Sequence, residues 1–336
     1  MLPDPRQPFT AEQTTQVLDH LLSGTLPSEE GGAFLAAWAA RGETGVEVAA
    51  VVRALLERAT VIPLPHQAFD LCGTGGSGLT RYNVSTTVAF LLASLGVPVA
   101  KHGNRGSTQP NGSFDLLEAL GVPFQLSPAQ QVDLFATTGL CFLFARQMHP
   151  AVATVAPLRK AAGGRTIFNL AGPLANPVRP QRQVVGVAQE RTAAVLLEAL
   201  HLLGVQRAVI VRGHPGLDEV SVTGPTQAWD LHQGQVRHLR FDHLHHPGLD
   251  HADLPGGQAP ENARLFHDLL AGRSPGPLED MVVANAAVAL ACWRDLPHLD
   301  SRETAAEVRE ALRQGNAAAT FQRHRTMARR LAGLAP

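Results

Sequence analysis

The sequence predicts an α/β protein with a small N-terminal helical domain and a larger α/β domain whose central sheet is mostly parallel. Residues 1–60 show only helical spacing of apolar residues, whereas from Phe69 onward short apolar runs alternate with longer helical ones. The chain has 336 residues, of which 45% are hydrophobic and 17% charged. This length and composition suit one large globular domain or two smaller ones.

Three helices are predicted in residues 1–60. Thr10 precedes AEQTTQVLDHLLSG and is followed by Gln13, and Thr44 is followed by Glu47, so each pair forms a capping box. The second helix begins at Ser28, and Gly42 ends it. Two prolines in residues 61–65 prevent a further helix, and we therefore predict a helical domain over 1–65 and an α/β domain over 66–336.

The α/β domain is predicted from alternating strands and helices. The expected strands are 69–72, 97–101, 141–145, 184–188 and 207–212. The expected helices are 84–95, 113–120, 128–138, 150–162 and 191–203. A further strand-like region covers 228–241, and residues 260–334 return to three or four helical segments. In such a sheet, ligands bind beyond the carboxyl ends of the strands.

Charge and cysteine usage exclude several classes of protein. With 28 basic and 29 acidic residues the net charge is −1, which argues against a general nucleic-acid-binding surface. The three cysteines are far apart in the sequence and lie in apolar runs, so we expect free thiols in a reducing compartment. The segment MLPDPRQPFT lacks the features of a signal peptide, and no apolar run reaches membrane-spanning length. A cytoplasmic protein is therefore expected.

The glycine-rich loop GTGGSG, residues 73–78, follows the first predicted strand. Glycine allows sharp turns that present backbone N–H groups to an anion. The next helix begins near Asn83–Thr86, and a helix N-terminus also favours anions. An ordinary glycine turn, with Asn83 or Ser85 as a simple helix cap, explains this loop equally well.

The second loop, KHGNRGST at residues 101–108, is more specific. Lys101 supplies a mobile positive charge and Arg105 a rigid guanidinium fork, and both suit phosphate oxygens. A basic surface turn is the alternative, but it has no need of His102, Asn104 and two glycines between the cations. The pattern therefore favours a phosphate site.

Two further groups of residues remain ambiguous from the sequence alone. Asp218 and Glu219 follow the predicted 207–212 strand and suit Mg²⁺, although adjacent acids in a loop are more often simply solvated. Arg159 lies on a mostly apolar helix, where it either holds a ligand carboxylate or extends to solvent. The cost of burying a charge favours the second reading of Arg159.

The order of these motifs over nearly the whole chain resembles the anthranilate phosphoribosyltransferases of tryptophan synthesis. The motifs are GTGGSG, NVST, KHGNR, GSFDLLEALGV, FLFARQMHP, PLRKAAGGRTIFNLAGPLANP and GLDEVS. The resemblance implies the nucleoside phosphorylase/phosphoribosyltransferase fold, in which a small helical domain packs on the α/β domain. Helices from about 165–185 are expected to join the small helical domain. The resemblance also implies a homodimer, phosphoribosyl pyrophosphate as donor, anthranilate as acceptor and Mg²⁺ as cofactor.

The resemblance also assigns site residues. For the donor they are Gly73, Gly76, Ser77, Arg81, Asn83, Val84, Ser85, Thr86, Lys101, His102, Gly103, Asn104, Arg105, Gly106, Ser107, Thr108, Gln109 and Ser113. For anthranilate they are Gly73, His102, Asn104 and Arg159, with Arg159 holding the carboxylate, which reverses the reading from the residues alone. For magnesium they are Ser85, Asp218 and Glu219. Lys101 and Arg105 are expected to stabilise the departing pyrophosphate electrostatically, and no catalytic acid or base is expected.

The chain departs from the family pattern at three places. Ser77 replaces the aspartate of GTGGDG, Arg81 replaces a small or hydroxyl residue, and Thr108-Gln109 replaces a serine pair. These changes redistribute charge at the expected donor site. Two other readings therefore stay open, namely a nucleoside phosphorylase of the same fold and a non-catalytic paralogue that binds a nucleotide or nucleic acid.

Overall fold

Seven strands form one sheet in the order β3-β2-β1-β4-β5-β6-β7. In the computed structural model, which describes residues 2–65, 67–79, 82–106, 110–242 and 244–335, the first five strands are parallel and the last two antiparallel. The strands are β1 (Phe69–Gly73), β2 (Val99–Gly103), β3 (Leu140–Phe144), β4 (Arg182–Gly186), β5 (Arg207–Gly213), β6 (Thr226–His232) and β7 (Gln235–Phe241). The predicted mostly parallel sheet is confirmed.

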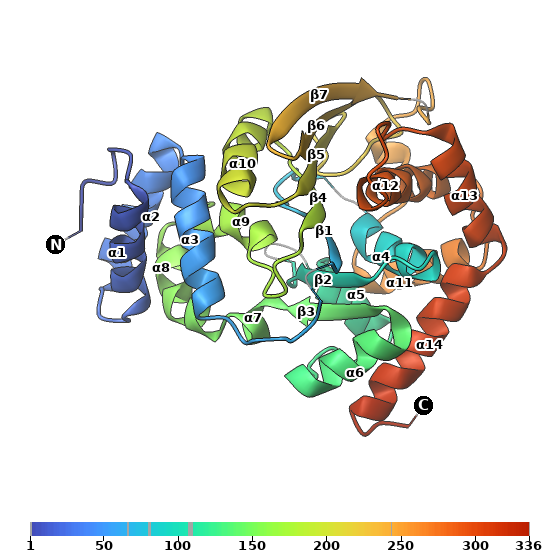
Figure 1. Cartoon of the computed structure of the whole chain (residues 1–336), viewed down its shortest axis with the longest axis horizontal. Helices are drawn as coiled ribbons and strands as arrows, with labels where there is room; N and C mark the ends of the chain where they lie inside the picture. The colour runs from blue at the N-terminus through green and yellow to red at the C-terminus, as the bar shows by residue number, and fades with distance from the viewer. Residues whose placement is uncertain (1, 66, 80–81, 107–109, 243, 336) are drawn as a thin grey trace.

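Helices surround this sheet and also form the N-terminal end of the molecule (Figure 1). The N-terminal helices are α1 (Ala11–Leu22), α2 (Ser28–Arg41) and α3 (Gly45–Glu57). Those between the parallel strands are α4 (Val84–Ser94), α5 (Ser113–Ala119), α6 (Pro128–Thr138), α7 (Ala145–Met148), α8 (Ala156–Ala161), α9 (Ile167–Ala171) and α10 (Glu190–Leu202). The C-terminal ones are α11 (Ala259–Leu270), α12 (Pro277–Trp293), α13 (Arg302–Arg313) and α14 (Asn316–Leu331). Short 3₁₀ segments are η1 (Pro150–Val155), η2 (Gly172–Leu174) and η3 (His251–Asp253).

Local sequence signals correctly place the N-terminal helices. Both predicted capping boxes are present, because the Thr10 and Thr44 hydroxyls accept the N–H groups of Gln13 and Glu47. The Glu47 carboxylate is fully buried and accepts two hydrogen bonds from Arg41, at 2.7 and 2.8 Å. Figure 1 shows these helices at one end of the molecule, beside α8 and opposite the C-terminal helices.

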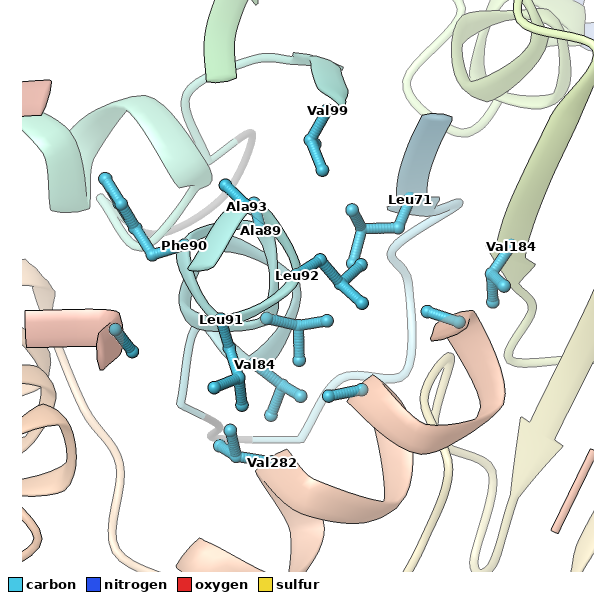
Figure 2. Packing of buried hydrophobic residues seen from close by; sticks show 14 of the residues in the cluster. Leu71, Val84, Ala89, Phe90, Leu91, Leu92, Ala93, Val99, Val184 and Val282 are labelled. Carbon is cyan, nitrogen blue, oxygen red and sulfur yellow. The ribbon is translucent and has the colours of Figure 1, made fainter. Parts of the chain in front are cut away.

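The two faces of the sheet belong to different hydrophobic clusters because side chains alternate along each strand. On one face Val209 and Val211 of β5 join the cluster that contains α4 and α12. On the other face Ala208 and Ile210 join the cluster that contains α10 and the N-terminal helices. Figure 2 shows α4 surrounded by apolar side chains from the sheet and from α12, as expected for a helix that is apolar on every side.

Several element boundaries differ from the sequence prediction, and β4, for example, runs from 182 to 186 rather than from 184 to 188. β2 runs from 99 to 103 rather than 97 to 101, because Lys101, His102 and Gly103 pair with β3. The single helix expected over 150–162 is the 3₁₀ segment η1 followed by α8, with a proline in the first turn of each. The region 228–241 is a hairpin, with a turn at Gln233-Gly234 between β6 and β7.

The segment that was expected to join the helical domain, about 165–185, has two parts. Its helical residues are α9 and η2, whose apolar side chains pack in the same cluster as the N-terminal helices. Its last residues enter β4, at the centre of the sheet.

Among the helices of the described residues, none is both long and apolar enough to cross a lipid bilayer.

Candidate active site

The candidate site lies where β1 and β4 end side by side. β2 pairs with one edge of β1 and β4 with the other, because the chain runs outward from β1 to β2 and β3 and then crosses back to β4 on the opposite side of β1. A crevice opens at such a switch point, beyond the carboxyl ends of the strands, and it is the usual ligand site in open α/β sheets. β1, β2, β4 and β5 all end in glycine, and the loops with the predicted site residues follow three of these ends.

The first glycine loop is fixed by hydrogen bonds from two other loops. The Thr74 N–H donates to the Gly186 carbonyl at 2.9 Å, and the Gly75 N–H donates to Asp218 Oδ2 at 2.8 Å. A Cβ at Gly73 would lie 2.2 Å from that same carboxylate oxygen, so only glycine lets Asp218 approach. The structure therefore brings Gly73 and Asp218 together, although they are far apart in the sequence.

Arg165 holds this loop from the α8–α9 connection. Its Nη1 donates to the Gly75 carbonyl at 2.9 Å and its Nη2 to the Thr74 carbonyl at 3.1 Å. Gly76 has a φ of +88°, and a Cβ there would lie 2.0 Å from Nη1. No role for Arg165 was predicted from the sequence. Its presence in the GGRTIFN motif was the only available signal.

The N-terminus of α4 contributes buried and partly buried residues. Val84 and Thr86 are buried, and the Thr86 hydroxyl oxygen makes no hydrogen bond within the described parts of the chain. Ser85 is half-buried in the first turn. Asn83 is held in an amide cluster, because its side chain donates to the Asn111 carbonyl at 3.0 Å and accepts from Asn262 at 2.8 Å. Asn83 thus connects α4 to the segment before α5 and to α11.

Lys101 and His102 both lie in β2, whereas the predicted strand ended at Lys101 and left His102 in the loop after it. Lys101 is 1% exposed, and its Nζ donates to the Leu71 carbonyl of β1 at 2.6 Å. Burial lowers the pKa of Lys101, while the carboxylate of Asp70 acts against that shift. The ammonium group therefore lies within the sheet, against the backbone of β1.

Asp70 is the buried partner of this cation and also accepts three hydrogen bonds. The donors are the N–H groups of Leu71 and His102 and the Asn176 side chain, the last at 2.9 Å. Burial raises the pKa of Asp70 to about 6, with Lys101 as the strongest opposing influence. This network was not predicted, because nothing local in the sequence relates Asp70 to Asn176.

The His102 ring lies beside that of His149, with 5.2 Å between the ring centroids. Burial, together with His149, lowers the pKa of His102 to about 3, so the ring is neutral at physiological pH. Its Nε2 is buried and has no hydrogen-bond partner among the described residues. A neutral ring with one unpartnered nitrogen suits hydrogen bonding to a ligand and does not suit charge neutralisation.

The second loop is organised by α5. Arg105 donates two hydrogen bonds to Glu118, at 2.7 and 2.9 Å, and one to Asp115 at 3.1 Å. These bonds, those to Glu118 first, raise the pKa of Arg105. Asp115 also accepts the N–H groups of Gly106 and Gly112, each at 2.8 Å. The guanidinium that was expected on pyrophosphate is thus engaged by two carboxylates here, and this geometry favours a positioning role for Arg105.

The remaining residues of the second loop lie close to α5. Asn104 is exposed, and its side chain accepts the Arg105 N–H at 2.9 Å. A Cβ at Gly103 would lie 3.6 Å from the Ser113 hydroxyl, so the end of β2 is adjacent to the start of α5. The predicted residues Arg81, Ser107, Thr108 and Gln109 lie outside the described residues.

Asp218 and Glu219 provide a donor set that suits a hard divalent cation. Asp218 is 4% exposed, and the next residue, Val220, exchanges two backbone hydrogen bonds with the Asn285 side chain of α12. No cluster of three His, Cys, Asp or Glu side chains able to hold a metal occurs in the described residues. Mg²⁺ commonly binds to one or two carboxylates together with water and substrate phosphates. Asp218, which lies beside Gly73 and Gly75, and the next residue Glu219 supply carboxylates of this kind.

Arg159 is half-buried on α8, and its guanidinium lies over the Phe168 ring, 5.7 Å from the centroid. Burial lowers its pKa. It makes no hydrogen bond or ion pair with any residue that the structure describes. The guanidinium donors are therefore available to an external acceptor, and a planar carboxylate matches their geometry.

Known proteins resemble this chain over both of its predicted domains. Residues 5–59 match the family model "Glycosyl transferase family, helical bundle domain", and residues 65–318 match "Glycosyl transferase family, a/b domain". The anthranilate phosphoribosyltransferase of Desulfatibacillum aliphaticivorans is 40% identical over 93% of this chain and 92% of its own. The enzyme of the same name from Sphingopyxis alaskensis is 42% identical over 86% of this chain and 87% of its own.

Two solved structures extend these similarities to the fold. Anthranilate phosphoribosyltransferase from Thermus thermophilus superimposes with a TM-score of 0.86 at 35% identity, covering 96% of this chain and 97% of that one. The Saccharomyces cerevisiae enzyme, solved in complex with phosphoribosyl pyrophosphate and magnesium, also has a TM-score of 0.86, at 25% identity. It covers 95% of this chain and 93% of the yeast chain.

Proposed function

The chain belongs to the glycosyl transferase family that includes these anthranilate phosphoribosyltransferases, and on that premise we propose that it transfers a phosphoribosyl group to anthranilate. The donor is phosphoribosyl pyrophosphate, and the products are N-(5-phosphoribosyl)anthranilate and pyrophosphate. The reaction is a step in tryptophan biosynthesis. The alternatives of a nucleoside phosphorylase and of a non-catalytic paralogue lose support, because relatives of 40–42% identity carry the transferase name.

One observation carries this proposal. The glycine loop at the β1–β4 switch point donates a hydrogen bond from the Gly75 N–H to the carboxylate of Asp218. The candidate anion-binding loop and a candidate metal ligand are therefore in direct contact. Mg²⁺ would be held by Asp218, Glu219 and Ser85, and when bound it supplies positive charge to the pyrophosphate. The yeast relative, solved with the same donor and magnesium, supports this assignment.

The donor's phosphates would lie against the remaining predicted residues of the two loops and of the α4 N-terminus. Gly73, Gly76 and the first turn of α4 offer backbone N–H groups, and Lys101 adds a buried positive charge. Gly103, Asn104, Gly106 and Ser113 would line the second loop. The assignment of Arg105 to the pyrophosphate remains a prediction, which its bonds to Glu118 do not favour.

The acceptor would bind with its carboxylate on Arg159 and its ring toward His102 and Asn104. The amine of anthranilate is unprotonated at neutral pH, so it attacks C1 of the ribose without a general base. The C1–oxygen bond to pyrophosphate breaks in an oxocarbenium-like transition state, in which negative charge grows on the leaving group. Catalysis is then mainly positioning and electrostatic stabilisation.

Turnover is the direct test of this function. Purified protein is mixed with anthranilate, phosphoribosyl pyrophosphate and Mg²⁺, and the loss of anthranilate fluorescence is followed. We expect loss of fluorescence only when all three are present. Folded protein that shows no turnover at high substrate concentrations would contradict the proposal.

Ser77→Asp is expected to change how the rate depends on magnesium and donor. Ser77 belongs to the first loop, and its hydroxyl accepts the Leu79 N–H at 3.3 Å, so an aspartate adds negative charge beside the pyrophosphate site. We expect the Mg²⁺ concentration for half-maximal rate to shift by about two- to tenfold, since nearby charges usually change ligand affinity by about 1 kcal/mol. Rates measured across Mg²⁺ and donor concentrations, with Ser77→Ala as the control, test this. Identical curves for all three proteins would show that the Ser77 departure is neutral.

We also propose that two copies associate into a homodimer and that the enzyme works in the cytoplasm. The homodimer follows from the family resemblance and is measured by light scattering of the purified protein. The cytoplasmic location is in line with Cys72, Cys141 and Cys292, which are free thiols.

A further inference from the structure

Arg165 comes from the α8–α9 connection, next to the N-terminal helices, but its guanidinium lies on the glycine loop of the sheet. It donates to two successive carbonyls, those of Thr74 and Gly75, at 3.1 and 2.9 Å. Burial lowers its pKa, while the carboxylates of Asp218 and Glu43 act in the opposite direction. Arg165 is therefore a cation placed between the loop after β1, the loop after β5 and the α2–α3 connection.

These contacts hold the loop peptides from both sides. In the Thr74–Gly75 peptide the carbonyl accepts from Arg165, while the N–H donates to Asp218 at 2.8 Å. Because a trans peptide is planar, its C=O and N–H point in opposite directions. Arg165 and Asp218 therefore act on opposite sides of the same peptide and fix its orientation.

The same argument orients the next peptide. The Gly75 carbonyl points to Arg165, so the Gly76 N–H must point away from Arg165. This N–H makes no hydrogen bond to the part of the chain that the structure describes. Gly76 has a φ of +88°, and any Cβ would collide with the guanidinium, so glycine is required for this arrangement.

We propose that Arg165 is a positioning residue for the donor: by holding the Thr74 and Gly75 carbonyls, it presents the Gly76 N–H to a phosphate of the donor. The inference rests on the proposed function, because it takes the loop as the donor site. It gives Arg165 a role different from that of Arg159, which faces the acceptor. Loss of the Arg165 guanidinium should therefore weaken binding of the donor and leave the contacts of the acceptor in place.

Steady-state kinetics of Arg165→Gln and Arg165→Lys test the proposal. We expect the KM for phosphoribosyl pyrophosphate to rise about tenfold or more in Arg165→Gln, with kcat and the KM for anthranilate within about twofold of wild type. Arg165→Lys should recover part of the loss, since an ammonium can still donate to one carbonyl. Arg273→Gln, which alters an exposed arginine paired with Asp268, is the matched control. Equal increases in both KM values would overturn the donor-specific role.

Hydrogen–deuterium exchange on the free protein tests the loop itself without any turnover. Peptides that cover residues 73–79 should exchange faster in Arg165→Gln than in wild type or Arg273→Gln. Unchanged exchange there would overturn the claim that Arg165 holds the loop. If wild type lacks transferase activity but this difference in exchange appears, the proposed function fails while the positioning of the loop stands. Equal melting temperatures ensure that folded proteins are compared.

Discussion

Asp218→Asn is expected to lower kcat/KM for phosphoribosyl pyrophosphate by at least about 100-fold, since even indirect partners of a bound metal commonly contribute about 10- to 100-fold. Asp218 has two roles in the proposed site. Its Oδ2 accepts the Gly75 N–H at 2.8 Å, and its charge would help to hold magnesium. Asparagine retains an oxygen that can accept the Gly75 N–H but removes the charge. The substitution therefore separates the metal role from the role in loop structure.

The measurement is the initial rate across Mg²⁺ concentrations, together with calorimetric titration of Mg²⁺ and donor. We expect the variant to need more Mg²⁺ and to bind the donor weakly even at saturating metal. Asp268→Asn is the control for removal of a negative charge, because Asp268 forms an ion pair with the exposed Arg273. A wild-type Mg²⁺ dependence in Asp218→Asn would show that Asp218 is not a metal ligand.

Arg159→Gln is expected to raise the KM for anthranilate by about 50-fold, the equivalent of about 2–3 kcal/mol for a charge-assisted pair of hydrogen bonds. Arg159 is half-buried and stacked on Phe168, and its N–H groups make no hydrogen bond to the described residues. A preoriented, partly desolvated guanidinium binds a carboxylate more strongly than an exposed one does. The KM for the donor should stay near the wild-type value.

A substrate without the carboxylate makes this test specific. With 2-aminobenzamide in place of anthranilate, wild type and Arg159→Gln should show similar, low kcat/KM, because neither can form the ion pair. Lys160→Gln, next in sequence and exposed, controls for a general loss of positive charge on α8. An unchanged KM for anthranilate in Arg159→Gln would refute the carboxylate role.

Features that depend on neighbours in the chain were predictable. The capping boxes at Thr10 and Thr44 follow from residues three positions apart, and both are formed. The strands were found from short apolar runs, and the parallel sheet follows from their alternation with helices. The resemblance, which rests on ordered motifs, correctly indicated the family.

Contacts between residues that are far apart in the sequence could not be predicted from local patterns. Lys101 was predicted at the end of a strand and the start of a phosphate loop, yet pairing with β3 extends the strand to Gly103 and buries its ammonium against Leu71. Arg105 reads as a phosphate ligand, but Asp115 and Glu118 of α5 engage it. No role for Arg165 was predicted, and only its contacts with the Thr74 and Gly75 carbonyls indicate one.

Helix caps, strand periodicity and glycine turns are local properties of the chain, so the order of the elements, the family and the two glycine loops could be predicted without a structure. Which charged groups are paired within the protein, and which keep their donors available near the candidate site, became known from the folded arrangement. A cation's partner is set by long-range packing: Arg105 is engaged by carboxylates of α5, whereas the Arg159 donors are free among the described residues. Whether a charged side chain binds a ligand or supports a loop depends on this difference.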